Sequence, residues 1–238
     1  MYQELQRKKS DLQSKKPYDL NTAVALRELD QLDHVCNAMM LSGAEYSREE
    51  IRGMMEGEMP KTASLKDCLF VRNYVELIDV IQDSISIKCS LDSKLLLKFH
   101  NILAGQVKGF RRINQAVAEF KHVPPNHSEI ESKLNQLFKT VYGNDSNEIR
   151  NASLIHYGIL SIYPFEEYSE IMARVAMNYY LQEKGYLPVA LGYNHKEYVS
   201  TMIECLKDNN DALFYWGLER AEFNKLTQAL QIIETMRD

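Results

Sequence analysis

The sequence is poor in the two residues that most often interrupt helices. It contains 10 glycines and 6 prolines among 238 residues. Its apolar residues recur at intervals of three and four rather than two, which is the spacing of a helical face rather than of a strand. The composition therefore argues against a strand-rich fold and predicts helices along most of the chain.

Paired cysteines are also absent. The four cysteines are widely scattered, form no Cys-x-x-Cys motif and have no histidine at zinc-binding spacing; they are Cys36, Cys68, Cys89 and Cys205. This arrangement excludes a disulfide framework and a zinc finger. We expect reduced, mostly buried thiols, which is typical of a cytoplasmic protein.

The chain has no long apolar segment and no excess of positive charge. No stretch approaches the roughly 18 to 20 apolar residues of a membrane span, and residues 1–16 lack the apolar centre of a signal peptide. The formal net charge of −5 argues against nucleic-acid binding. Only a local basic patch remains, for example Lys108, Arg111 and Arg112. The chain is therefore expected in the cytoplasm, without nucleic-acid or membrane partners.

The pattern predicts a series of amphipathic helices. Ser47 and Glu50 form a capping-box pair that opens a short helix reaching about Met55. Ser90 or Asp92 begins another helix, which ends at Gly105. Further helices are expected over 20–41, 64–84, 127–142, 146–162, 169–184, 195–208 and 211–236.

One segment, 106–125, departs from the helical pattern. It contains Gly109, alternating and β-branched residues, and then Pro124–Pro125, which together predict a short irregular hairpin. The sequence shows no linker, repeat or low-complexity tract. We therefore expect an all-α fold in one compact domain, with residues 1–60 as an N-terminal helical extension and 61–238 as the core.

The segment Ser161–Arg174 joins two apolar helices and runs into the N-terminus of the second. The free N–H groups and the positive dipole end of a helix attract anions. This joint is therefore the most informative place to look for a functional site.

The residues of this joint resemble the motif of the Fic family, His-Pro-Phe-x-(Asp/Glu)-Gly-Asn-(Gly/Lys)-Arg-x-x-Arg. Four positions match it, namely Pro164, Phe165, Glu167 and Arg174. The likeness continues outside the motif and covers about residues 20–220. It includes Gly109–Arg111 before the family's flap, His122–Pro125 at the end of that flap, and Lys184–Pro188 at the close of the motif helix.

The resemblance implies a Fic fold with a β-hairpin flap and, for active members, transfer of AMP from ATP with Mg2+ to a hydroxyl on a target protein. Tyr163 stands where the family has its catalytic histidine. A phenol has a pKa near ~10 and is a poor general base at neutral pH. Glu167 keeps the Mg2+ position, Ser169 and Arg174 lie at the phosphate site, and Pro164 and Phe165 pack the motif.

Besides Tyr163, four further motif positions depart from the family. Tyr168, Ser169 and Glu170 replace the Gly-Asn-Gly that lets the backbone approach phosphates closely. Tyr168 and Glu170 add bulk, and Glu170 adds negative charge. Ile171 replaces the first motif arginine and supplies no charge-assisted hydrogen bond. With Tyr163, these changes predict that standard AMP transfer is lost.

The resemblance also assigns the flap and an inhibitory contact. Phe120, His122 and Val123 are its flap residues. Glu45 matches the glutamate of the family's N-terminal inhibitory helix, although Leu41 and Tyr46 depart from that pattern. We therefore expect Glu45 to pair with Arg174. Arg112 and Lys121, which flank the flap, are expected to be solvated charges.

Two functions follow. In the first, the chain is a regulatory or interaction module that binds a protein partner, including an active Fic relative or a second copy of itself. In the second, it is a nucleotidyl or other phosphate-group transferase that uses ATP and Mg2+, with Tyr163 or His156 as an altered base. His156 is interpreted mainly as a structural histidine, and Tyr163 as an aromatic that seals the site.

Overall fold

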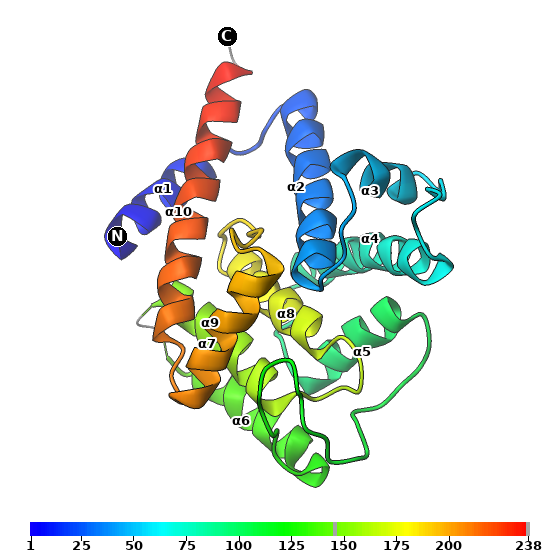
Figure 1. Ribbon diagram of the computed structural model, residues 1–238. Coiled ribbons are helices and arrows are strands. Elements are labelled where there is room, and N and C mark those ends of the chain that lie inside the picture. Colours follow the sequence, from blue (N-terminus) through cyan, green and yellow to red (C-terminus); the bar gives the residue numbers. More distant parts are fainter. Residues whose placement is uncertain (145–146, 237–238) are drawn as a thin grey trace.

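The computed structural model describes residues 1–144 and 147–236. Ten α-helices and one short 3-10 helix make up nearly all the regular structure of these residues (Figure 1). The elements are α1 (Tyr2–Ser14), α2 (Leu20–Leu41), α3 (Arg48–Met55), α4 (Leu65–Ser86), α5 (Ser93–Ala104), η1 (His127–Glu129), α6 (Ile130–Tyr142), α7 (Glu148–Ile162), α8 (Ser169–Glu183), α9 (His195–Lys207) and α10 (Ala212–Thr235). The predicted all-α fold is confirmed.

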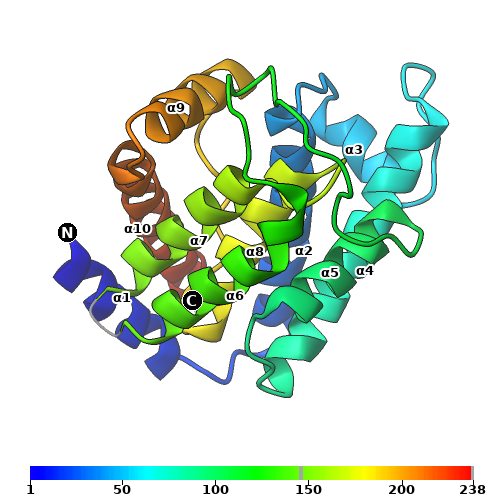
Figure 2. The same cartoon turned by 90° about the horizontal axis from the view of Figure 1, so that it is seen from below.

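Helices α7 and α8 form the centre of the bundle. They pack against each other along most of their length, and α4, α5, α6, α9 and α10 surround them (Figures 1 and 2). Every residue of α8 from Ile171 to Leu181 is buried. Because α8 has no solvent-facing stripe over this stretch, its N-terminal loop is fixed in place by the core.

The predicted helix boundaries have local causes that the structure confirms. The Ser47 hydroxyl accepts the Glu50 backbone N–H at 3.2 Å, and the Glu50 carboxylate accepts the Ser47 N–H at 2.8 Å. Asp92 caps α5 by accepting the Leu95 N–H at 2.7 Å. Gly105 ends that helix with φ of +64°, a left-handed conformation that glycine adopts without steric cost.

The expected β-hairpin at 106–125 is not confirmed. Among the described residues, this segment has no strand and holds a single antiparallel bridge between Val117 and His122. Lys121, with φ of +49°, turns the chain between them. The backbone on the N-terminal side bonds elsewhere, since the Arg111 N–H donates to the Pro164 carbonyl at 2.9 Å. No ladder can form where the backbone groups are used in this way.

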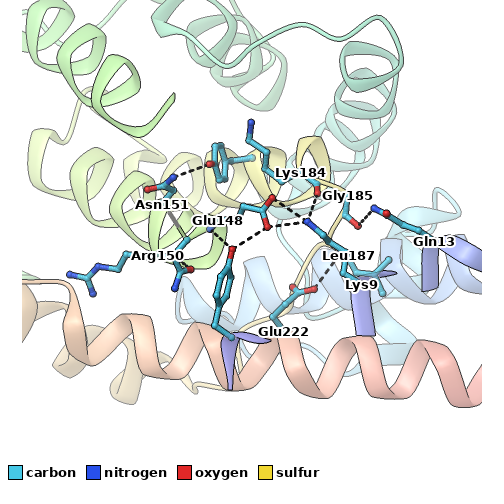
Figure 3. Close-up of polar contacts among 12 residues, drawn as sticks. Lys9, Gln13, Glu148, Arg150, Asn151, Lys184, Gly185, Leu187 and Glu222 are labelled. Atoms are coloured by element: carbon cyan, nitrogen blue, oxygen red, sulfur yellow. Dashed lines mark hydrogen bonds and ion pairs between the residues drawn. The ribbon is translucent and has the colours of Figure 1, made fainter. Parts of the chain in front are cut away.

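Helix α1 is a feature that the periodicity did not predict. Only Leu5 and Leu12 are buried on it. Polar contacts complete its attachment, because the Lys9 ammonium lies 3.0 Å from the Glu148 carboxylate and 3.1 Å from the Lys184 carbonyl (Figure 3). Helix α1 also packs against the last helix, α10 (Figure 1). None of the described helices is long and apolar enough to cross a membrane.

Candidate functional site

The loop between α7 and α8 begins and ends in left-handed backbone. Tyr163 has φ of +47° and ends α7, and Tyr168 has φ of +67° and begins α8. Residues other than glycine and asparagine rarely adopt this backbone conformation, which costs about 1 kcal/mol for each such residue. Surrounding contacts must therefore hold the loop in shape.

Arg111 supplies the main polar contacts to this loop. Its side chain is almost fully buried, with 2% exposure. Nε donates to the Tyr163 carbonyl at 2.8 Å, Nη1 donates to the Ile113 carbonyl at 2.8 Å, and Nη2 donates to the Pro125 carbonyl at 2.6 Å. The Arg111 guanidinium thus connects the end of α7, at Tyr163, to two parts of the flap segment, at Ile113 and Pro125.

An aromatic stack holds the loop from the other side. Phe165 is completely buried and stacks on His100 of α5, with ring centroids 3.8 Å apart and planes 4° apart. His100 Nε2 also lies 3.2 Å from the Glu167 carbonyl. Pro164 is buried beside Phe165. These contacts place Pro164 and Phe165 in the core beneath the loop.

Ser169 closes the loop on itself. Its hydroxyl accepts the Phe165 backbone N–H at 2.9 Å and lies 3.0 Å from the Phe165 carbonyl oxygen, to which it donates. The residue is fully buried. Both hydrogen-bonding functions of this hydroxyl are therefore used inside the protein rather than offered to a phosphate.

Tyr163 and Glu170 lie together at the mouth of α8. The Tyr163 hydroxyl donates to the Glu170 carboxylate at 3.4 Å. Burial and the neighbouring Glu170 charge raise the pKa of Tyr163 above its usual value. Burial also raises the pKa of Glu170, against the attraction of Arg174. The phenol therefore stays protonated and is not a proton acceptor near neutral pH.

Arg174 lies one helical turn after Glu170 on α8 and is buried. It is 4% exposed, and its guanidinium carbon lies 5.1 Å from the centroid of the Tyr198 ring. Nη2 is 3.5 Å from the Ser42 hydroxyl. Nη1 has no hydrogen-bond partner among the described residues.

The expected ion pair between Glu45 and Arg174 is not formed in the part of the chain that the structure describes. Glu45 is exposed. Helix α2 ends at Leu41, and Gly43, with φ of +83°, turns the chain sharply. Ser42, the C-cap of α2, lies near Arg174, and Glu45, after the turn, is exposed to solvent, which corrects the sequence-based expectation.

Glu167 lies on the surface between two lysines. Its carboxylate is 3.1 Å from the Lys108 ammonium and 3.8 Å from that of Lys66. The hydrogen bond from Lys108 is the largest cause of its lowered pKa. Nowhere in residues 1–144 and 147–236 do three or more His, Cys, Asp or Glu side chains form a metal-binding group. Mg2+ needs oxygen ligands, and at Glu167 it would have to compete with the two lysines that already pair with this carboxylate.

His156 lies in the core rather than beside Tyr163. Its Nε2 is 3.0 Å from the Tyr198 hydroxyl, and its ring stacks on Phe214 with centroids 4.0 Å apart. Burial, followed by the Arg174 charge, holds its pKa well below the usual value. This neutral, fully buried imidazole has no access to a substrate at the loop.

The flap residues have three different environments. Phe120 is buried and meets the edge of the Tyr198 ring, with centroids 6.2 Å apart. His122 Nε2 lies 2.7 Å from the Ser161 carbonyl, and Val123 is 76% exposed. Lys121, next to His122, is exposed, as is Arg112.

Sequence reasoning missed two residues that organise this region, His100 and Tyr198, and did not predict the role of a third, Arg111. His100 carried no signal at all, because nothing near it in the chain suggests its stack on Phe165. Arg111 was noticed only as part of a short matching segment and a basic patch. Tyr198 of α9 contacts Phe120, His156 and Arg174, and only the three-dimensional fold brings these together.

Comparison with known families agrees with this geometry. A helical bundle whose central helix starts from a Pro-Phe loop, with a flap segment beside it, has the architecture of a Fic domain. Residues 90–181 match the model of the Fic/DOC family. No curated protein matches the sequence.

Solved structures extend the likeness over nearly the whole chain. A Fic-domain-containing signaling protein from Bacteroides thetaiotaomicron is 17% identical, with a TM-score of 0.84 and 97% of each chain covered. A Fic family protein from Desulfovibrio desulfuricans is 15% identical, with a TM-score of 0.77 over 96% of this chain and 73% of that one. A fragment of Fic-1 from C. elegans is 16% identical, with a TM-score of 0.77 over 99% and 72%. At these identities the likeness establishes the fold.

Proposed function

We propose that this Fic-domain protein does not transfer AMP by the family's standard route and acts as a regulatory or interaction module that binds a protein partner. The observation that carries the proposal is the contact between Tyr163 and Glu170. A protonated phenol occupies the position of the general base, and a carboxylate occupies the position of the phosphates. Residues 1–60 serve in this proposal as an extension carried by the core, 61–238.

The remaining loop contacts support the same reading. The Ser169 hydroxyl is spent on the Phe165 backbone, so it offers nothing to a nucleotide. The Tyr168 ring lies 5.7 Å from that of Phe70 and takes up space where the family has glycine. ATP with Mg2+ therefore does not fit the residues present in the family's standard pose.

The direct test is incubation of the purified protein with Mg2+ and ATP labelled at the α-phosphate, alone and in a cell lysate. We expect no labelled protein, and no shift of the melting temperature when ATP and Mg2+ are added. The matched control is an active Fic enzyme in the same assay. Labelling of the protein itself or of a lysate protein that disappears in Glu167→Ala contradicts the proposal.

A second candidate is a phosphate-group or nucleotidyl transferase with altered catalytic residues. It is favoured by one observation, the unpartnered Nη1 of buried Arg174 at the second motif arginine position. His156 is too deeply buried to be its base, which leaves Tyr163. This candidate predicts that ATP raises the melting temperature and that Arg174→Met abolishes the shift. An unchanged melting temperature at millimolar ATP removes it.

A further inference from the structure

Two leucines in the first turns of α4 are exposed to solvent. Leu65 and Leu69 have exposures of 63% and 39% and lie one helical turn apart. Residues four apart share one face of a helix, so the two side chains form a continuous apolar strip, called the leucine strip below. Apolar groups that lie together in water gain free energy when a partner covers them. The leucine strip is therefore a candidate docking surface.

Glu167 joins the leucine strip to the segment that follows α5. Its carboxylate lies 3.8 Å from the ammonium of Lys66, which is next to Leu65, and 3.1 Å from the ammonium of Lys108. Val107, next to Lys108, is 94% exposed. Because two ammonium groups share one carboxylate here, positive charge remains around the apolar side chains.

Positive charge continues over α5, which packs against α4 (Figure 2). Residues 93–118 contain no Asp or Glu, although the whole chain has a formal net charge of −5. The exposed or partly exposed cations of residues 65–76 and 93–118 are Lys66, Arg72, Lys94, Lys98, Lys108 and Arg112. The carboxylates of the same stretches and of the loop before α8 are Asp67, Glu76, Glu166 and Glu167. In an acidic protein, this surface therefore carries an excess of positive charge.

The surface selects the chemistry of a partner. Charge complementarity at an interface favours acidic groups opposite these cations, and the leucine strip requires apolar groups between them. Two leucines one turn apart match the spacing of apolar side chains on an amphipathic helix. Residues 61–112 contain no strand, so this surface has no sheet edge to which a partner strand could add. An acidic amphipathic helix satisfies these conditions together.

Nucleic acid and lipid fit the surface less well. Single-stranded nucleic acid stacks its bases on accessible aromatic rings, whereas the aromatic residues of 61–112 are buried or only partly exposed. Anionic membranes attract clusters of about 4 to 8 cations, and here four carboxylates lie among the cations. Both alternatives are outcomes of the test below.

We propose that the leucine strip, with Val107 and the surrounding cations, binds an acidic amphipathic helix of a partner protein. The inference rests on the proposed function, because it names the chemistry of the protein partner. The partner's apolar side chains cover Leu65 and Leu69, and its carboxylates pair with cations such as Arg72. Arg72 lies on the same face of α4 as the two leucines, one turn beyond Leu69.

Selection from a displayed library of random peptides of about 16 residues, roughly four helical turns, tests the proposal without knowledge of the partner. The whole protein is the bait, and the Leu65→Ser/Leu69→Ser protein is the counter-bait. We expect the enriched peptides to be acidic, with apolar residues at intervals of three and four. Enriched peptides that are neutral or basic overturn the proposal, as does a selection with no enrichment over the counter-bait.

Substitutions locate the binding of an enriched peptide, followed by fluorescence anisotropy. Leu65→Ser/Leu69→Ser is expected to weaken binding at least about tenfold. Leu20→Ser/Val24→Ser is the matched control, because these residues form an exposed apolar pair of the same spacing on α2, with exposures of 78% and 44%, and it should leave the affinity unchanged. Equal effects of the two double substitutions overturn the proposed surface.

A charge reversal tests the acidic character of the partner. Arg72→Glu is expected to weaken binding of the enriched peptide about three- to tenfold at about 0.05 M salt, and less at about 0.5 M salt, because salt screens exposed charges. Arg7→Glu makes the same change at an exposed position on α1 and should have no effect. An affinity of Arg72→Glu equal to that of the wild type at low salt overturns the charge argument.

Two further measurements separate the other occupants. Co-sedimentation with phosphatidylserine vesicles that is lost in Leu65→Ser/Leu69→Ser would assign the strip to lipid, and a dimer in analytical ultracentrifugation that dissociates in this variant would assign it to a second copy; either result overturns the proposal. Failure of the proposed function is distinguishable from both. Transfer of label from ATP would remove that function, whereas peptide selection would still report on the strip, since the substituted residues lie outside 161–174.

Discussion

Arg111 donates a hydrogen bond from Nε to the carbonyl of Tyr163 at 2.8 Å, across 52 residues of the chain. This bond joins the flap segment to the residue that ends α7. The same guanidinium reaches the carbonyls of Ile113 and Pro125. A planar group with five N–H donors is suited to bind several carbonyls at once, which an ammonium group cannot reproduce in the same geometry.

Replacement of Arg111 by methionine is therefore expected to reduce the free energy of unfolding by about 2 to 4 kcal/mol, because several carbonyls lose their donor. Arg111→Lys should recover less than half of this loss. Urea denaturation measures both. Arg112→Met is the matched control, since Arg112 is exposed, and it should change stability by less than about 0.5 kcal/mol. Equal losses of stability in Arg111→Met and Arg112→Met would contradict the proposed role of the Arg111 hydrogen bonds.

Ser169→Ala tests whether the loop depends on its internal hydrogen bonds. The change leaves the buried Phe165 N–H and carbonyl without the serine hydroxyl, so we expect a loss of about 1 to 3 kcal/mol in the free energy of unfolding. Ser200→Ala, at an exposed position on α9, serves as the control. Chemical denaturation that gives the same midpoint for both variants argues against a structural role of Ser169.

Glu222 is expected to make stability depend on pH. Burial raises the pKa of this carboxyl to about 8, from 4.5, although Lys225 and Lys9 oppose the shift and Asp30 adds to it. The folded state thus keeps a proton that the unfolded chain releases above pH 4.5. The resulting stabilisation is present below about pH 4.5 and is lost as the pH rises toward about 8.

Glu222→Gln removes this titration while keeping the shape of the side chain. Relative to the variant, the wild type should lose stability on the order of 3 kcal/mol between pH 5 and pH 8.5. Thermal unfolding across this range gives the difference curve. Glu234→Gln, at an exposed position on the same helix, should run parallel to the wild type, and a flat difference curve for Glu222→Gln refutes the raised pKa.

Helices with a strong apolar pattern or a local cap could be predicted from the sequence. Helix α2 has the predicted bounds, and α3 begins at the predicted capping box. Helix α1 could not be found this way, because two buried leucines among polar residues give no periodic signal. Its position depends on Lys9, whose partners lie 139 and 175 residues further along the chain.

In the candidate site, too, some features could be predicted from the sequence and others could not. The motif positions could be found because their order in the chain is local. The role of His100 could not, since its partner Glu167 is 67 residues away. The pair expected between Glu45 and Arg174 was wrong because the turn at Gly43 redirects the chain. The direction of a side chain after a turn depends on backbone dihedral angles that spacing alone does not determine.

Lys9→Met tests how α1 is attached. Lys9 and Glu148 are mostly buried, with side-chain exposures of 16% and 26%, and removal of one partner leaves the other charge poorly solvated. We expect amide hydrogen exchange in α1 to accelerate about tenfold, which corresponds to about 1.4 kcal/mol of local stability. Arg7→Met, at an exposed position on the same helix, should leave exchange unchanged. Unaltered protection in Lys9→Met would show that Leu5 and Leu12 hold the helix without help from the polar contacts in Figure 3.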